Sequence, residues 1–171
     1  MTELENAENN ELELSSIEED TQEGKYLTFP LRNEEYGIEI RNVTEIIGIQ
    51  SITSLPDMPF FVKGVINLRG KVIPVIDVRS RFGFDPRAYD ERTCIIVVNI
   101  DGRVVGLIVD SVNEVIDIAP NNIEPPPRVK KGEPSRFIKA LGKVGDKVKI
   151  LLDINQMLVK FDPELIQKAV E

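Results

Sequence analysis

Residues 67–83 read NLRGKVIPVIDVRSRFG, two apolar runs separated by an Arg-Gly-Lys turn and followed by charged residues. This stretch has a copy further along the chain. With a shift of 76 residues, KGVINLRGKVIPVIDVRSRF (63–82) aligns with KALGKVGDKVKILLDINQML (139–158). Four identical residues fall in phase: Lys63 with Lys139, Lys71 with Lys147, Val72 with Val148 and Asp77 with Asp153. The chain therefore contains a duplicated hairpin.

A second pair of segments repeats with a shift of 69. YLTFPL, the turn NEE and YGIEI, followed by NVTEIIGI, correspond to CIIVVNI, the turn DG and RVVGLIV, followed by DSVNEVIDI. Five identities are in phase: Gly37 with Gly106, Val43 with Val112, Glu45 with Glu114, Ile47 with Ile116 and Ile49 with Ile118. The seven extra residues of the larger shift are expected in the segment 121–135, whose Pro, Lys and Gly content predicts a loop. The chain is thus two related halves, about 25–84 and 93–160.

The pattern of each half predicts a hairpin, a short polar-started segment, a second hairpin and a brief helix. Val and Ile dominate the apolar residues, which favours an all-β fold. Asp77 and Asp153 stand where helix N-caps belong, with the first helix ending near Gly83 and the second running to Pro163. Pro74 predicts an edge or bulged strand. Short strands with frequent turns indicate two small barrels, one for each half, lying side by side with a groove between them.

The charge of the chain is unevenly distributed. The formal net charge is -8, but residues 1–23 hold nine Asp and Glu and no Lys or Arg, which leaves +1 on the rest. Low hydrophobicity and like charge predict a disordered tail. Two interpretations stay open for it, an acidic interaction arm and the favoured one, a solubilising extension. No signal peptide and no apolar run near the ~18 residues of a membrane helix is present, so a cytoplasmic protein is expected.

The residues that usually carry out catalysis are scarce. There is no histidine, and the single cysteine, Cys94, lies in an apolar strand and is interpreted as a core residue. Acidic pairs such as Glu34 with Glu35, or Asp85 with Asp90, lie in turns where solvated carboxylates are expected. No phosphate-binding glycine motif occurs, and a neutral domain without Trp is a poor match for nucleic acid, which is kept as a minor alternative. We predict a binding protein without cofactor or metal.

The arginine of the opening stretch stands out when the two halves are compared. The turn Arg69-Gly70 of the first half is Gly145-Asp146 in the second. A turn position that accepts glycine in one copy has no backbone reason to hold a long cation in the other. Arg69 is therefore a candidate contact residue, with a solvated turn charge as the equally favoured alternative.

Four segments occur in order with suitable spacing: EEYGIEI, KGVINLRGKVIPVIDVRSRFG, VVGLIVDSVNEV and IEPPP. They resemble the CheW-like domain family of bacterial chemotaxis coupling proteins over roughly residues 24–160, within a domain of 24–162 that leaves 163–171 as a C-terminal extension. The resemblance implies two five-stranded SH3-like barrels around a shared core, with short helices. It also implies a non-enzymatic adaptor that links the cytoplasmic helical-hairpin tips of chemoreceptors to the regulatory domain of the histidine kinase CheA, with no direct membrane insertion.

The same resemblance places the coupling residues of the family on six positions of this chain, and Ile40 flanks the first of them. A groove would bury Ile40 and Val43, while Arg69 makes charge-assisted bonds to the partner. Gly64 is equally explained by a strand bulge, and the two later valines by core packing. The resemblance does not divide the set between receptor and kinase. The candidate residues are Ile40, Val43, Glu45, Gly64, Arg69, Val112 and Val115.

Overall fold

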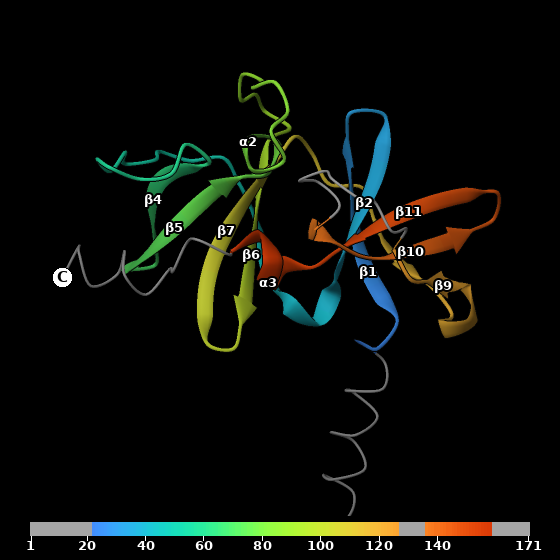
Figure 1. The fold of residues 1–171 in the computed structure, drawn as a ribbon. Helices are drawn as coiled ribbons and strands as arrows, with labels where there is room; N and C mark the ends of the chain where they lie inside the picture. Colours follow the sequence, from blue (N-terminus) through green and yellow to red (C-terminus); the bar gives the residue numbers. More distant parts are fainter. Residues whose placement is uncertain (1–21, 127–135, 159–171) are drawn as a thin grey trace, which may run out of the picture.

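The structure is a computed structural model that describes residues 22–126 and 136–158. Two β-sheets lie side by side in it (Figure 1). Sheet 1 has the order β8-β1-β2-β11-β10-β9, with β1 at Lys25–Leu31, β2 at Glu34–Glu39, β8 at Val115–Asp117, β9 at Ile123–Glu124, β10 at Ile138–Val144 and β11 at Lys147–Leu152. Sheet 2 has the order β3-β6-β7-β5-β4, with β3 at Val43–Gly48, β4 at Val62–Leu68, β5 at Lys71–Asp77, β6 at Cys94–Ile100 and β7 at Arg103–Val109.

The helices of the described ranges are one-turn elements. α2 at Val78–Arg81 follows β5, and α3 at Ile154–Met157 follows β11. Both predicted N-caps are confirmed, because Asp77 accepts from the Ser80 amide at 3.1 Å and Asp153 from the Gln156 amide at 3.3 Å. Two 3-10 helices, η1 at Ile40–Asn42 and η2 at Pro120–Asn122, precede β3 and β9.

The duplication is visible in the order of the strands. A shift of 69 carries β1, β2 and β3 onto β6, β7 and β8, and a shift of 76 carries β4 and β5 onto β10 and β11. When each strand is exchanged for its copy, the order of sheet 2 becomes β8-β1-β2-β11-β10. This is the order of sheet 1 without β9, so the two sheets are copies of one arrangement.

Each sheet nevertheless takes strands from both halves of the chain. Sheet 2 combines β3, β4 and β5 with β6 and β7 of the second half, while β1 and β2 join the later strands in sheet 1. The all-β class is confirmed, but the sheets do not follow the predicted division into 25–84 and 93–160. The reason is that the copies share one apolar pattern, so a hairpin can pair with either copy of its neighbour. The orders are compatible with the SH3-like barrels, whose closure stays a prediction.

Two parallel pairings mark the places where the halves meet within a sheet. β5 pairs with β7 through Val75 and Gly106, and β11 pairs with β2 through Leu151 and Gly37. A Cβ atom on Gly106 would lie 2.9 Å from Val75 Cγ1 and 2.7 Å from a methyl of Ile95, and one on Gly37 would lie 2.9 Å from Leu151 Cδ2. The shared glycine thus makes room for the side chain of the parallel neighbour.

The apolar residues form three clusters, and the largest lies between the sheets. Alternate residues of one strand enter different clusters: Ile96 and Val98 face the shared core, whereas Ile95 and Val97 face a cluster on the other side of sheet 2. Burial on both faces explains the continuous apolar runs of these strands. Sheet 1 carries its own smaller cluster of Tyr26, Ile118, Ala140 and Leu151.

A buried arginine lies where the two copies meet. The guanidinium carbon of Arg81 lies 4.2 Å from the ring centre of Phe61 and 4.7 Å from that of Phe137. Its Nε–H donates to the Met157 carbonyl at 2.7 Å. The shift of 76 carries Phe61 onto Phe137 and Arg81 onto Met157, so Arg81 contacts Phe61 within its own copy and Phe137 and Met157 of the other copy. The hydrogen bond to Met157 ties α2 to α3, and the cation–π contact with Phe137 adds a second link between the copies.

Three local predictions need correction. Pro74 lies in β5, second from the edge, and the register shift of that hairpin falls in β4 between Val62 and Gly64; the ladder to β7 begins only after the proline. The predicted loop 121–135 includes β9, which pairs with β10, while its residues 127–135 lie outside the described ranges. α3 ends at Met157 and is thus shorter than the predicted helix. The rest of its predicted course, residues 159–163, lies outside the described ranges. So do the predicted extension 163–171 and residues 1–21 of the predicted tail.

We predict that Gly106→Ala lowers the free energy of unfolding by about 1–3 kcal/mol, because the added methyl group overpacks the parallel junction. Gly48→Ala in β3 is the matched control, since a Cβ atom there meets nothing within 4 Å. Urea denaturation of both variants measures the difference. Equal stability of the two variants would show that the junction accommodates a methyl group at residue 106 and would contradict this prediction.

Candidate functional site

Arg69 occupies a strained position in the turn between β4 and β5. Its φ is +51° and that of Gly70 is +84°, as in a two-residue hairpin turn of type I′. The Asn67 side chain accepts from the Gly70 amide at 2.9 Å and supports this turn. The equivalent Gly145 also has a positive φ, +63°. The backbone therefore prefers glycine at this position, and arginine is kept in spite of it.

The side chain of Arg69 has a partner on β3. Its guanidinium Nη2 contacts Glu45 Oε1, although 73% of the Arg69 side chain is exposed. β3 and β4 are the two ends of the strand order in sheet 2, so this ion pair joins the ends of the sheet. A guanidinium has five N–H donors, and one contact leaves others for a second carboxylate. Two predicted site residues thus form one unit.

Gly64 has a structural role. Its φ is +143°, and a Cβ atom there would lie 2.0 Å from the Thr53 carbonyl oxygen. Beside it, Thr53 and Val65 exchange two backbone hydrogen bonds of 2.9 Å each. The segment that follows β3 is thereby attached to β4, at a register shift of the β4–β5 hairpin. The alternative of a bulge with close backbone approach is supported, and any effect of Gly64 on binding would act through sheet shape.

The apolar members of the predicted set divide into buried and exposed groups. Ile40, Val43 and Val112 are half-buried and pack against the shared core. Val115 lies in β8 at the edge of sheet 1 and is 50% exposed. The structure thus places Val43, Glu45 and Arg69 together on sheet 2, whereas Val115 belongs to the edge of the other sheet.

Sequence reasoning missed two exposed apolar residues. Ile46 in β3 is 41% exposed and is the copy of Val115 under the shift of 69. That shift was the signal that could have identified it, since both edge strands place an aliphatic side chain outward beside a glutamate. Phe60 is 71% exposed, and the equivalent residue in the other half is Arg136. Both residues are therefore candidates for contact with a partner.

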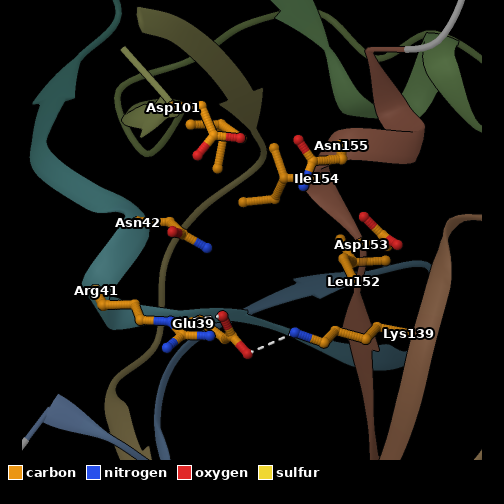
Figure 2. A pocket seen from close by; sticks show the side chains of 10 residues that line it. Glu39, Arg41, Asn42, Asp101, Lys139, Leu152, Asp153, Ile154 and Asn155 are labelled. Carbon is orange, nitrogen blue, oxygen red and sulfur yellow. Dashed lines mark hydrogen bonds and ion pairs between the residues drawn. The ribbon is translucent and has the colours of Figure 1, made fainter. Parts of the chain in front are cut away.

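A polar pocket of about 290 Å³ lies where the two sheets meet. In Figure 2, Arg41 and Asn42 of η1 lie across from Asp153 and Asn155 at the start of α3. Glu39 accepts from Lys139 at 2.7 Å and from Arg41 at 3.0 Å. Burial raises the pKa of Glu39, but these two cations outweigh it and hold the pKa below its ordinary value. Glu39 therefore pairs with both Arg41 and Lys139 at this pocket.

Few groups in the described ranges are arranged for chemistry. Cys94 is half-buried against the shared core, and burial raises the pKa of its thiol, which disfavours the reactive thiolate. Within the described residues, no three His, Cys, Asp or Glu side chains are placed to hold a metal ion. The helices of these same ranges are all too short or too polar to cross a membrane.

We predict that Arg69→Gly leaves the free energy of unfolding within about 0.5 kcal/mol of wild type. Relief of the left-handed strain offsets the loss of an exposed ion pair and the extra freedom of the unfolded chain. Arg69→Ala keeps the strain and loses the pair, so it should be less stable than Arg69→Gly. Urea denaturation decides, and a glycine variant less stable than the alanine variant would contradict this account.

Comparison with known proteins agrees with this architecture. The CheW-like domain model matches residues 25–161. The chain is 37% identical over 158 residues to chemotaxis protein CheW of Klebsiella aerogenes, covering 92% of this chain and 95% of that protein. It is 33% identical over 146 residues to chemotaxis protein CheW of Bacillus subtilis, covering 85% and 92%. The crystal structure of scaffolding protein TtCheW from Thermoanaerobacter tengcongensis is similar with a TM-score of 0.71 and 45% identity, covering 76% of this chain and 88% of that one. The chain belongs to the CheW-like domain family.

Proposed function

We propose that this protein is a non-enzymatic adaptor that links the cytoplasmic helical-hairpin tips of chemoreceptors to the regulatory domain of the histidine kinase CheA. The observation that carries the proposal is a pair of equivalent edge strands, β3 and β8, on two sheets that share one core. Membership of the CheW-like domain family and likeness to a protein described as a scaffold support it. The proposal places the protein in the cytoplasm, where its partners associate it with membrane receptor arrays.

Each edge strand has the features of a small binding surface. β3 exposes Ile46 beside Glu45, and β8 exposes Val115 next to Glu114. An apolar anchor with a neighbouring charge is a common arrangement for transient recognition, and contacts of about 800 Å² per partner or less are weak singly. Because a scaffold holds several partners together, many weak contacts add to a stable assembly.

The candidate residues take different roles under this proposal. Arg69 and Glu45 offer the charged contact at sheet 2, while Ile40 and Val43 support it from the shared core. Val115 is the apolar contact at sheet 1, and Val112 beneath it packs against the core. Gly64 shapes the surface without touching the partner.

A binding role accounts better for the charged residues than catalysis or nucleic-acid recognition does. Arg41 and Lys139, two cations at the polar pocket, are both engaged by Glu39. A nucleic-acid surface needs cations directed outward toward phosphates, and its binding would weaken steeply with salt. Partner binding through Ile46 and Val115 would instead change little with salt because apolar contacts dominate it.

We predict that Arg69→Gly lowers receptor-dependent activation of the kinase while the fold stays intact. An arginine anchor of this kind contributes roughly 2 kcal/mol, which corresponds to about thirtyfold weaker partner binding. Autophosphorylation of the kinase, reconstituted with a receptor fragment and either wild type or variant, measures the loss. Lys143→Ala, which removes an exposed ion pair with Glu124 at the far end of sheet 1, is the control. Full activation by the folded Arg69→Gly protein would remove Arg69 from the site.

Deletion of residues 1–23 is predicted to leave kinase coupling nearly unchanged. The deletion keeps Gly24, whose carbonyl accepts from the Ile118 amide at 2.9 Å, so the first strand retains its anchor. A solvated acidic extension contributes solubility rather than contacts. The same reconstitution compares full-length and shortened protein, and a large loss of activation would identify the tail as an interaction arm.

A further inference from the structure

Sheet 1 contains an ion pair in a place where sheet 2 has only aliphatic side chains. Lys149 of β11 is 9% exposed, and its ammonium group contacts a carboxylate oxygen of the half-buried Glu35 in β2. The shift of 69 carries Glu35 onto Val104, and the shift of 76 carries Lys149 onto Ile73. Both of those residues belong to the apolar cluster of sheet 2. The fold therefore accepts aliphatic side chains at these two positions.

The burial of this ion pair is weak evidence for a stabilising role. Burying two charges removes them from water, and replacing a buried pair by apolar side chains of similar volume is often neutral or stabilising. Burial raises the pKa of Glu35, but the hydrogen bonds from Lys149 and Asn113 and the charge of Lys149 outweigh it and keep the pKa below its ordinary value. Glu35 is thus held as a carboxylate that accepts from several donors at once.

One of those donors belongs to the segment before β8. The Asn113 side-chain amide donates to Glu35 Oε1 at 2.9 Å, and the Asn113 backbone amide donates to the Thr28 carbonyl at 2.8 Å. Thr28 donates in turn to the Glu114 carbonyl through its backbone amide at 2.8 Å and its hydroxyl at 2.9 Å. The copy of Asn113 in the other half is Thr44, whose hydroxyl bonds directly to the Val97 carbonyl at 3.1 Å. Asn113 is thus attached through the Glu35 carboxylate, whereas its copy Thr44 is attached directly to the backbone of the neighbouring strand.

We propose that Glu35 and Lys149 are positioning residues that fix residues 111–114, and thereby the presentation of Val115 to a partner. Lys149 orients the Glu35 carboxylate on the face of sheet 1 that lies opposite the shared core, and Glu35 accepts from the exposed Asn113 side chain. The segment 111–114 is attached to sheet 1 through hydrogen bonds with Glu35 and Thr28. The binding role of Val115 in this inference rests on the proposed function.

The test replaces the pair by the residues of the other copy, in the double variant Glu35→Val with Lys149→Ile. Its urea midpoint should match or exceed that of wild type, because the same aliphatic pair is accepted in sheet 2. Hydrogen exchange at the backbone amide of Asn113 should become at least tenfold faster, since the segment loses the side-chain hydrogen bond from Asn113 to Glu35. Lys143→Ala is the matched control for loss of a lysine in the same sheet, and it should change neither quantity.

Partner binding completes the test. The partner whose affinity falls in Val115→Ala, either the receptor fragment or the kinase regulatory domain, is the one that binds at the β8 edge. The double variant should bind that same partner about tenfold more weakly. Unchanged exchange, unchanged affinity or a clear fall in the urea midpoint would overturn the inference. A wild-type protein that binds neither partner would instead overturn the proposed function, and hydrogen exchange would then decide whether Glu35 and Lys149 fix the segment.

Discussion

The parallel junctions between strands of different halves hold this structure together. At each junction a glycine, Gly37 or Gly106, admits the side chain of the neighbouring strand. Because every sheet needs strands from both halves, neither half can complete a sheet from its own strands alone, and the apolar faces meet in one shared core. Arg81, whose guanidinium lies over the rings of Phe61 and Phe137, joins the two helices through its hydrogen bond to the Met157 carbonyl. The consequence is a single unit in which the edge strands β3 and β8 keep a fixed relative orientation.

Agreement and disagreement between the two copies separate the needs of the fold from those of function. The helix caps Asp77 and Asp153 agree because each strand must pass into a helix at that point. The copies disagree at positions that the fold does not require to be the same. Arg69, for example, stands in place of a glycine in a turn whose backbone favours glycine. Exposed Phe60, whose copy is Arg136, is a second case. Such departures cost stability or solubility and are best explained by partners.

Much of the fold could be predicted from the sequence, because a duplication repeats its caps, turns and glycines in phase. The exchange of strands could not, since both copies offer the same apolar pattern and local preference does not choose between them. The contact between Arg69 and Glu45 was hidden for a related reason, as it depends on the ends of sheet 2 approaching each other. Of the candidate site, the half-buried Val43 and Val112 followed from resemblance, whereas exposed Ile46 required knowledge of which strands lie at an edge.

The proposed adaptor is expected to hold two partners at the same time, since its two edges belong to one unit. Sedimentation velocity of the protein mixed with a receptor fragment and the kinase regulatory domain tests this most directly. The account predicts one species that contains all three proteins and sediments faster than either binary complex. Mutual displacement of the two partners, or failure of both to bind, would contradict it.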